Sequence, residues 1–299
     1  MSFTSHYLTC AGRELHYTDW RPAAPVRGTV VAWHGLARTG RDMDELAAHL
    51  SARGWRVLCP DMVGRGLSQW AEHPKDEYCL AFYARIAREL LVQLGIEHCH
   101  WVGTSMGGAI GMVAASGLFE PELRARILSL TLNDSAPELA ATAIERIKAY
   151  AGQPPAFDRV TELEAFLRTA YKPYGFLTDA QWRRLTETST RRLPDGRVTP
   201  HYDPAIVQQF THHPDDYLLW SHYDALAVPV LLLRGAESDL VLRDTAERMT
   251  TRGPGARGQL RWIEVPGCGH APALNVPAQL DVVSNFIGRA ERSVNAIAA

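Results

Sequence analysis

Two things are scarce in this sequence, long hydrophobic runs and cysteines, and each absence excludes a class of protein. No apolar run reaches the ~18 residues that a membrane-spanning helix needs, and residues 1–10 lack the charged and apolar blocks of a secretory signal. We therefore expect no contact with a membrane. Only five of the 299 residues are cysteines, scattered singly at Cys10, Cys59, Cys79, Cys99 and Cys268. An odd number of isolated cysteines predicts reduced thiols and hence the cytoplasm.

An excess of charge of one sign is also missing. The chain has 31 Lys and Arg residues against 33 Asp and Glu residues, which gives a net charge of -2. A nearly neutral surface offers no electrostatic footprint for nucleic acid and no basic patch for an anionic membrane. The composition is otherwise that of a globular protein, with 46% hydrophobic and 21% charged residues. The length permits one large domain with a sizeable insertion.

Short β-rich runs alternate with helical patterns in the first half of the chain. Predicted strands cover residues 29–33, 55–59, 99–102 and 127–132. Predicted helices lie between them, over residues 42–53, 80–94 and 107–117. Strands that alternate with helices indicate a parallel sheet covered on both faces. The sequence therefore predicts an α/β fold.

This alternation stops near Asp134 and returns after residue 224. Residues 135–224 contain no strand-length β run, but they hold eight of the 18 prolines and 12 of the 26 aromatic residues. Further on, residues 228–234 and 260–265 again have the pattern of buried strands. We therefore predict an α/β core domain formed by residues 1–134 and 225–299, interrupted by a mainly helical insertion of residues 135–224.

A candidate nucleophile lies between a predicted strand and a predicted helix, in the segment Gly103-Thr104-Ser105-Met106-Gly107. A strand that turns this sharply into a helix needs small residues two positions on either side of the central residue. The central side chain, that of Ser105, is then exposed above the sheet. The N–H group of Met106 is a candidate donor to a developing oxyanion. The alternative is an ordinary glycine-rich turn before a helix.

A serine hydroxyl is a weak nucleophile, so it needs a general base and a group that orients the base. Among 12 histidines, His270 follows the last predicted strand in a loop rich in Gly and Pro, which holds an imidazole in one place. For the acid we predict Asp239, after the strand at residues 228–234, because Ser, Asp, His is the order expected on an α/β sheet. Asp134, which also ends a strand, and Glu237 are rivals. Asp239 could instead cap a helix.

The segment His34-Gly35-Leu36 ends the first predicted core strand. Gly35 lets the backbone approach the reacting carbon, so we predict the Leu36 N–H group as a second oxyanion donor. His34 is a candidate substrate contact, although a structural ring beneath the loop is the favoured interpretation. Arg38 is a weaker candidate, for binding a substrate carboxylate. We expect no metal or cofactor, because residues 98–100 open a buried strand and lack two further spaced ligands.

Together these motifs resemble the α/β-hydrolase fold superfamily, and above all its lidded esterases and C–C bond hydrolases. The resemblance rests on five segments in order: His34-Gly35, Pro60-Asp61 with Gly64-Arg65-Gly66-Leu67-Ser68, the Ser105 turn, Gly235 to Asp239, and Gly269-His270. It implies that residues 135–224 are a helical cap over the active site and that water is the second substrate. It also implies a structural loop near the pocket, shaped by Asp61, Gly64, Gly66 and Ser68.

We therefore predict a serine hydrolase that cleaves small carboxylic esters through Ser105, His270 and Asp239. Its partners are a small-molecule ester and water, and a homodimer is left open. Three alternatives remain: a C–C bond hydrolase acting on a vinylogous diketone, a cofactor-free haloperoxidase or perhydrolase, and a binding protein without turnover. Related dehalogenases and epoxide hydrolases would have an aspartate at position 105, so the serine disfavours both.

Overall fold

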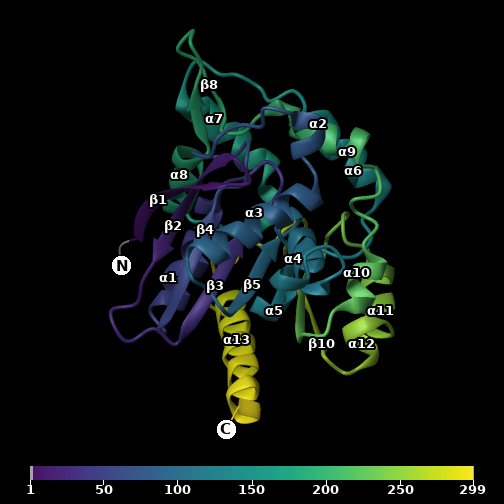
Figure 1. Ribbon diagram of the computed structural model, residues 1–299. Helices are drawn as coiled ribbons and strands as arrows, with labels where there is room; N and C mark the ends of the chain where they lie inside the picture. The colour runs from purple at the N-terminus through teal and green to yellow at the C-terminus, as the bar shows by residue number, and fades with distance from the viewer. Residues whose placement is uncertain (1–2, 299) are drawn as a thin grey trace.

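One eight-stranded sheet runs through the protein. The computed structural model describes residues 3–298, and its sheet has the strand order β1-β2-β4-β3-β5-β6-β9-β10 (Figure 1). These strands are β1 (Phe3–Cys10), β2 (Arg13–Trp20), β3 (Gly28–Trp33), β4 (Trp55–Pro60), β5 (Cys99–Thr104), β6 (Ile127–Asn133), β9 (Val230–Gly235) and β10 (Leu260–Val265). Strand β2 pairs antiparallel with both β1 and β4. The other neighbours in the sheet, β4-β3-β5-β6-β9-β10, pair parallel. The predicted α/β fold with a mostly parallel sheet is confirmed.

Helices cover both faces of the sheet, and the strand side chains alternate between them. On β3, Val30 and Ala32 pack in a cluster with helices α1 (Asp44–Ser51) and α13 (Pro277–Ala298). Val31 and Trp33 point the other way, into a cluster with α3 (Leu80–Gln93) and α4 (Met106–Ser116). Because both faces are buried, the central strands are continuous hydrophobic runs, which made them visible in the sequence. The remaining core helices are α2 (Pro74–Glu77), α5 (Pro121–Arg126), α11 (Arg243–Thr250) and α12 (Gly253–Ala256).

The N-terminal hairpin β1–β2 was not anticipated from the sequence. Strand β1 lies at the edge of the sheet, where it pairs only with β2, and most of its residues are exposed. An exposed edge strand needs no apolar run, so hydrophobic patterning did not reveal it.

The inserted segment, residues 135–224, joins β6 to β9. Most of it lies at the end of the molecule opposite α13, whereas its last helix lies beside α11 and α12 (Figure 1). Its helices are α6 (Ala141–Ala151), α7 (Val160–Ala170), α8 (Asp179–Thr188), α9 (Gln209–His212) and α10 (Trp220–Ala225). It also contains a hairpin of two three-residue strands, β7 (Thr190–Arg192) and β8 (Val198–Pro200), whose turn includes Gly196 at φ 88°. Strands this short have no detectable periodicity, which explains why the sequence indicated helices alone.

All five cysteines are buried, and none forms a disulfide. Burial raises the pKa of the Cys99 thiol to about 12, so this side chain remains a neutral thiol. The cysteines therefore act as small hydrophobic residues of the core. None of the helices within residues 3–298 combines the length and apolar character that crossing a bilayer requires.

Candidate active site

Ser105 occupies a sharp turn between β5 and α4, as its sequence context predicted. Its backbone has φ 53° and ψ −116°, in the left-handed region that residues with a Cβ rarely adopt. Glycine is required on both sides. A Cβ at Gly103 would lie 2.2 Å from the carbonyl carbon of Gly107, and one at Gly107 would lie 2.4 Å from the Trp33 oxygen. The strain and the close packing together keep the Ser105 side chain above the sheet.

The partner of His270 is Asp134, the rival that the sequence had ranked below Asp239. His270 Nδ1 lies 2.7 Å from Asp134 Oδ2. Thr104 pairs with Asn133 across the sheet, so Ser105 and Asp134 follow neighbouring strands at the same edge. A ring that donates through Nδ1 leaves Nε2 as its acceptor, which is the tautomer that a general base needs.

Three groups donate hydrogen bonds to the Asp134 carboxylate. Oδ1 accepts a hydrogen bond from the Gly235 N–H group at 2.8 Å, and Oδ2 accepts one from the Ser238 hydroxyl at 2.6 Å as well as that from His270. The side chain is fully buried, and its residue has φ 48°. A buried carboxylate with this many donors has one orientation, so the imidazole that it binds is also oriented.

Asp239, the predicted acid, has a different partner. It forms an ion pair with Arg146 of α6, and both side chains are half-exposed. The hydrogen bond from Arg146 is the main reason that the pKa of Asp239 lies below its usual range. The predicted pairing of Asp239 with His270 is therefore wrong. The loop after β9 instead contributes Gly235 and Ser238 to hold Asp134.

His34 positions the peptide that carries the predicted Leu36 donor. Its Nδ1 lies 2.6 Å from the Gly35 carbonyl oxygen, and its Nε2 accepts the Met62 N–H group at 2.9 Å. The N–H and C=O groups of a trans peptide point in opposite directions, so fixing the Gly35 oxygen also directs the Leu36 N–H group. With both nitrogens engaged and the side chain fully buried, His34 acts as a structural residue.

The buried His34 ring is expected to make stability depend on pH. Burial is the main cause that lowers its pKa to about 4, from about 6.5 in an unfolded chain. Because the pKa of His34 is lower in the folded state, the unfolded state takes up the proton at a higher pH. The contribution of His34 to the free energy of unfolding is therefore fully present above pH ~6.5 and is lost as the pH falls toward 4. Between pH 7.5 and pH 5 the loss is about 2 kcal/mol.

Urea unfolding of the wild type and of His34→Gln at both pH values tests this expectation. The neutral glutamine cannot titrate, so the variant should lose about 2 kcal/mol less than the wild type over the same interval. Equal pH dependence in the two proteins would contradict it. Other titrating groups change the free energy of unfolding equally in both proteins, so their contributions cancel when the two pH-induced changes are subtracted.

The loop that begins at Asp61, which the family resemblance implied, packs against the segment that carries Gly35 and Leu36. Asp61 is buried and accepts hydrogen bonds from the Gly40 and Leu67 N–H groups and from His16. Burial alone would raise the pKa of Asp61, but the hydrogen bond and charge of His16 outweigh it, so the pKa is lowered. From this loop the Arg65 Nε group donates to the Leu36 carbonyl at 2.8 Å. No pattern in the sequence indicated this role of Arg65, which anchors the residue after Gly35.

Arg38, the candidate carboxylate-binding residue, already has a carboxylate partner. It is 4% exposed, and its Nε and Nη2 groups donate to the two oxygens of Asp42, each at 2.6 Å. Nη2 also donates to Ser189 of the inserted segment at 2.9 Å. The guanidinium lies over the ring of Tyr171, 4.5 Å from its centroid. The Asp42 charge therefore compensates that of Arg38.

A cavity of about 760 Å³ lies between the core and the inserted segment. The core contributes Gly35 to Arg38, Thr104, Ser105 and the loop of Gly267 to Ala271. The inserted segment contributes residues of α6 and α7, and residues 171–174, 200 and 202. Ser105, His270 and Leu36 thus line one cavity, of the size that small-molecule sites have. Glu237 and Asp239 lie at its wall.

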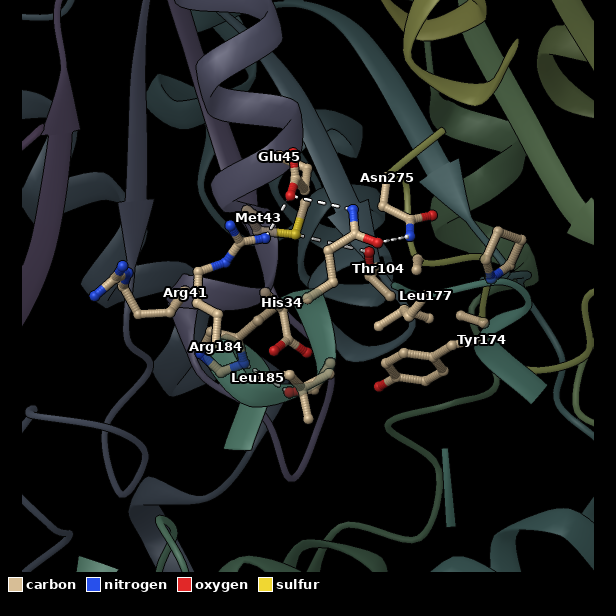
Figure 2. A pocket seen from close by; sticks show the side chains of 16 residues that line it. His34, Arg41, Met43, Glu45, Thr104, Tyr174, Leu177, Arg184, Leu185 and Asn275 are labelled. Carbon is tan, nitrogen blue, oxygen red and sulfur yellow. Dashed lines mark hydrogen bonds and ion pairs between the residues drawn. The ribbon is translucent and has the colours of Figure 1, made fainter. Parts of the chain in front are cut away.

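Figure 2 shows a smaller pocket, of about 50 Å³, that shares Gly35, Thr104, Tyr174 and Ala271 with this cavity. Several of its polar side chains are paired with one another. Gln181 of α8 donates to Glu45 of α1 at 3.2 Å and accepts from Asn275 at 3.2 Å. Arg184 of α8 forms an ion pair with Glu45 as well. The pocket therefore marks the seam where α8 is held on the core.

The comparisons with known proteins agree with this architecture. Residues 28–275 match the model of the family described as alpha/beta hydrolase fold, and the chain belongs to that family. A 3-hydroxybutyrate-oligomer hydrolase of Cupriavidus necator is 39% identical over 281 residues, 91% of this chain and 92% of that protein. A non-heme haloperoxidase of Rhodococcus erythropolis is 26% identical, over 87% of this chain and 90% of that one.

Among solved structures, an alpha/beta hydrolase from Novosphingobium aromaticivorans is similar over 96% of this chain and 98% of its own, with 31% identity and a TM-score of 0.81. The match spans the sheet and the inserted segment together. The family and these relatives support a hydrolase activity.

Proposed function

We propose that this protein hydrolyses carboxylic esters through Ser105, His270 and Asp134. The observation that carries the proposal is the hydrogen bond between His270 and the buried Asp134, next to a cavity that His270 shares with Ser105. This arrangement contains a nucleophile, a base and an orienting acid in the roles that acyl transfer requires.

In the proposed reaction His270 Nε2 takes the hydroxyl proton while Ser105 Oγ attacks the ester carbonyl carbon. The oxyanion of the tetrahedral intermediate accepts hydrogen bonds from the Leu36 and Met106 N–H groups. Met106 begins α4, where a helix leaves its amide without an intrahelical acceptor. Collapse of the intermediate breaks the ester bond, and the leaving alkoxide takes the proton from His270. Water then attacks the acyl-enzyme by the same route and releases the acid.

The substrates that we propose are short oligoesters of hydroxy acids, such as the 3-hydroxybutyrate oligomers in the name of the Cupriavidus relative. Two features of the chain support this class. The inserted segment covers the Ser105 cavity and so acts as a cap that limits the substrate to small molecules. The cavity wall also contains four tyrosines and Arg38, so it is not a continuous apolar channel for an alkyl chain.

The dependence on acyl length tests this proposal. We expect kcat/KM for p-nitrophenyl esters to rise over short chains, by at most ~0.8 kcal/mol for each buried methylene, and then to fall before palmitate. A long alkyl chain would desolvate the polar wall without pairing it, which costs free energy. A 3-hydroxybutyrate dimer or trimer should be cleaved as well.

A profile that rises steadily to palmitate, or activation at an oil–water interface, would indicate a lipase and contradict the proposal. Labelling of Ser105 by a fluorophosphonate without turnover of any ester would instead favour the C–C bond hydrolase alternative.

A further inference from the structure

Four tyrosines line the Ser105 cavity, and none of their hydroxyls has a hydrogen-bond partner within residues 3–298. They are Tyr150, Tyr171, Tyr174 and Tyr202. Away from this cavity, four buried tyrosines have bonded hydroxyls: Tyr78 with Asp203, Tyr83 with Arg65, Tyr217 with Gln209 and Tyr223 with the Met249 carbonyl. The hydroxyl of the buried Tyr17 on β2 has no such bond in the described residues. The four hydroxyls on the cavity wall are therefore available to a ligand.

Arg38 also lines this cavity, and one of its three guanidinium nitrogens donates to no group among the described residues. Its Nε and Nη2 atoms are bonded to Asp42 and Ser189, whereas Nη1 has no partner in the described part of the chain. Tyr171 lies under the guanidinium, and its ring centroid is 4.8 Å from that of Tyr174. Tyr202 is only 3% exposed. Donor-bearing side chains from the core and from the inserted segment thus line one cavity.

The chemistry of these groups selects what they can bind. Burial raises the pKa of Tyr150, Tyr174 and Tyr202, so their phenols stay protonated and able to donate. A guanidinium has donors only. Donors on a cavity wall that have no protein partner can donate to a ligand that carries acceptor oxygens. An alkyl chain would satisfy none of them.

We propose that Arg38 and these four tyrosines form a subsite that binds the ester and hydroxyl oxygens of the substrate beyond the scissile bond. The inference rests on the proposed ester hydrolysis and specifies its substrate. An oligomer of a 3-hydroxy acid carries a carbonyl in every repeat of four backbone atoms, so an acceptor recurs along its length. Because Asp42 already compensates the Arg38 charge, the subsite takes neutral oxygens and needs no carboxylate.

Removing one hydroxyl tests the subsite. The substrates are p-nitrophenyl 3-acetoxybutyrate, which carries a second ester, and p-nitrophenyl hexanoate, which has an apolar chain of similar length. We expect Tyr202→Phe to lower the ratio of kcat/KM for the acetoxy ester to that for the hexanoate by about three- to tenfold. Tyr171→Phe should act in the same direction. Tyr7→Phe, which removes the same atom from an exposed tyrosine of β1, should leave the ratio unchanged.

A direct binding measurement accompanies the kinetics. In a Ser105→Ala background, the methyl ester of a 3-hydroxybutyrate trimer should bind about three- to tenfold more weakly when Tyr202 is replaced by phenylalanine. Thermal unfolding of each variant shows whether it is folded, and the loss of a hydroxyl that bonds to no protein group should not lower its midpoint.

The outcomes separate this inference from the proposed function. If the wild type hydrolyses the esters but the ratio is the same in Tyr202→Phe and Tyr171→Phe, the subsite is overturned and the ester hydrolase stands. If the methyl ester of the trimer fails to bind while the free acid binds, the subsite recognises a carboxylate and the neutral-oxygen inference is wrong. If neither ester is hydrolysed and Ser105 resists a fluorophosphonate, the proposed function itself fails.

Discussion

Ser105→Ala is expected to lower kcat for ester hydrolysis by a factor of about 10⁴ to 10⁶. Without the hydroxyl no acyl-enzyme forms, and only the oxyanion donors and substrate binding remain to assist attack by water. The substitution removes one atom from the strained turn and leaves Gly103 and Gly107 unchanged, so the fold should persist. Steady-state kinetics on a short p-nitrophenyl ester measures the effect.

Covalent labelling gives an independent measurement of the same role. A fluorophosphonate should add one adduct to the wild type and none to Ser105→Ala, as intact-mass spectrometry would show. Ser284→Ala, which removes the same atom from the distant helix α13, is the matched control and should keep both labelling and activity. If Ser105→Ala retained more than about a tenth of wild-type kcat, far above what loss of a nucleophile leaves, Ser105 would not be the nucleophile.

Asp134→Asn is expected to lower kcat by about 10⁴, whereas Asp239→Asn should cost far less. The Asp134 carboxylate accepts from Gly235, Ser238 and His270, so an amide must direct its NH₂ group at one of these donors. The imidazole would then lose its acceptor or adopt the other tautomer. Asp239→Asn makes the same chemical change in the loop after β9, but it breaks only an ion pair with Arg146 that is open to solvent.

The two asparagine variants control for each other, because the chemical change is identical. Circular dichroism should show that both are folded before kcat is compared. A larger loss of kcat in Asp239→Asn than in Asp134→Asn would mean that the loop after β9 supplies the acid during turnover. It would reinstate the prediction made from the chain order of the motifs.

Elements whose cause is local could be predicted from the residues alone. The central strands are hydrophobic runs because both of their faces are buried, and this burial follows from helices on each side of a parallel sheet. The turn at Ser105 was visible because steric exclusion at Gly103 and Gly107 allows nothing larger than glycine. The His34-Gly35 segment was visible because it directly follows a hydrophobic strand, β3.

The assignment of the acid to Asp134 and not to Asp239 required the three-dimensional arrangement of the loops. Strands β6 and β9 are neighbours whose carboxyl ends meet at one edge of the sheet, so spacing and order do not separate the two acids. The choice depends on which carboxylate the distant groups Gly235, Ser238 and His270 converge on. Likewise, the tyrosines that face the cavity could not be told from those of the core. Hydrogen bonds and side-chain directions depend on how segments far apart in the chain pack together, and no local pattern encodes that packing.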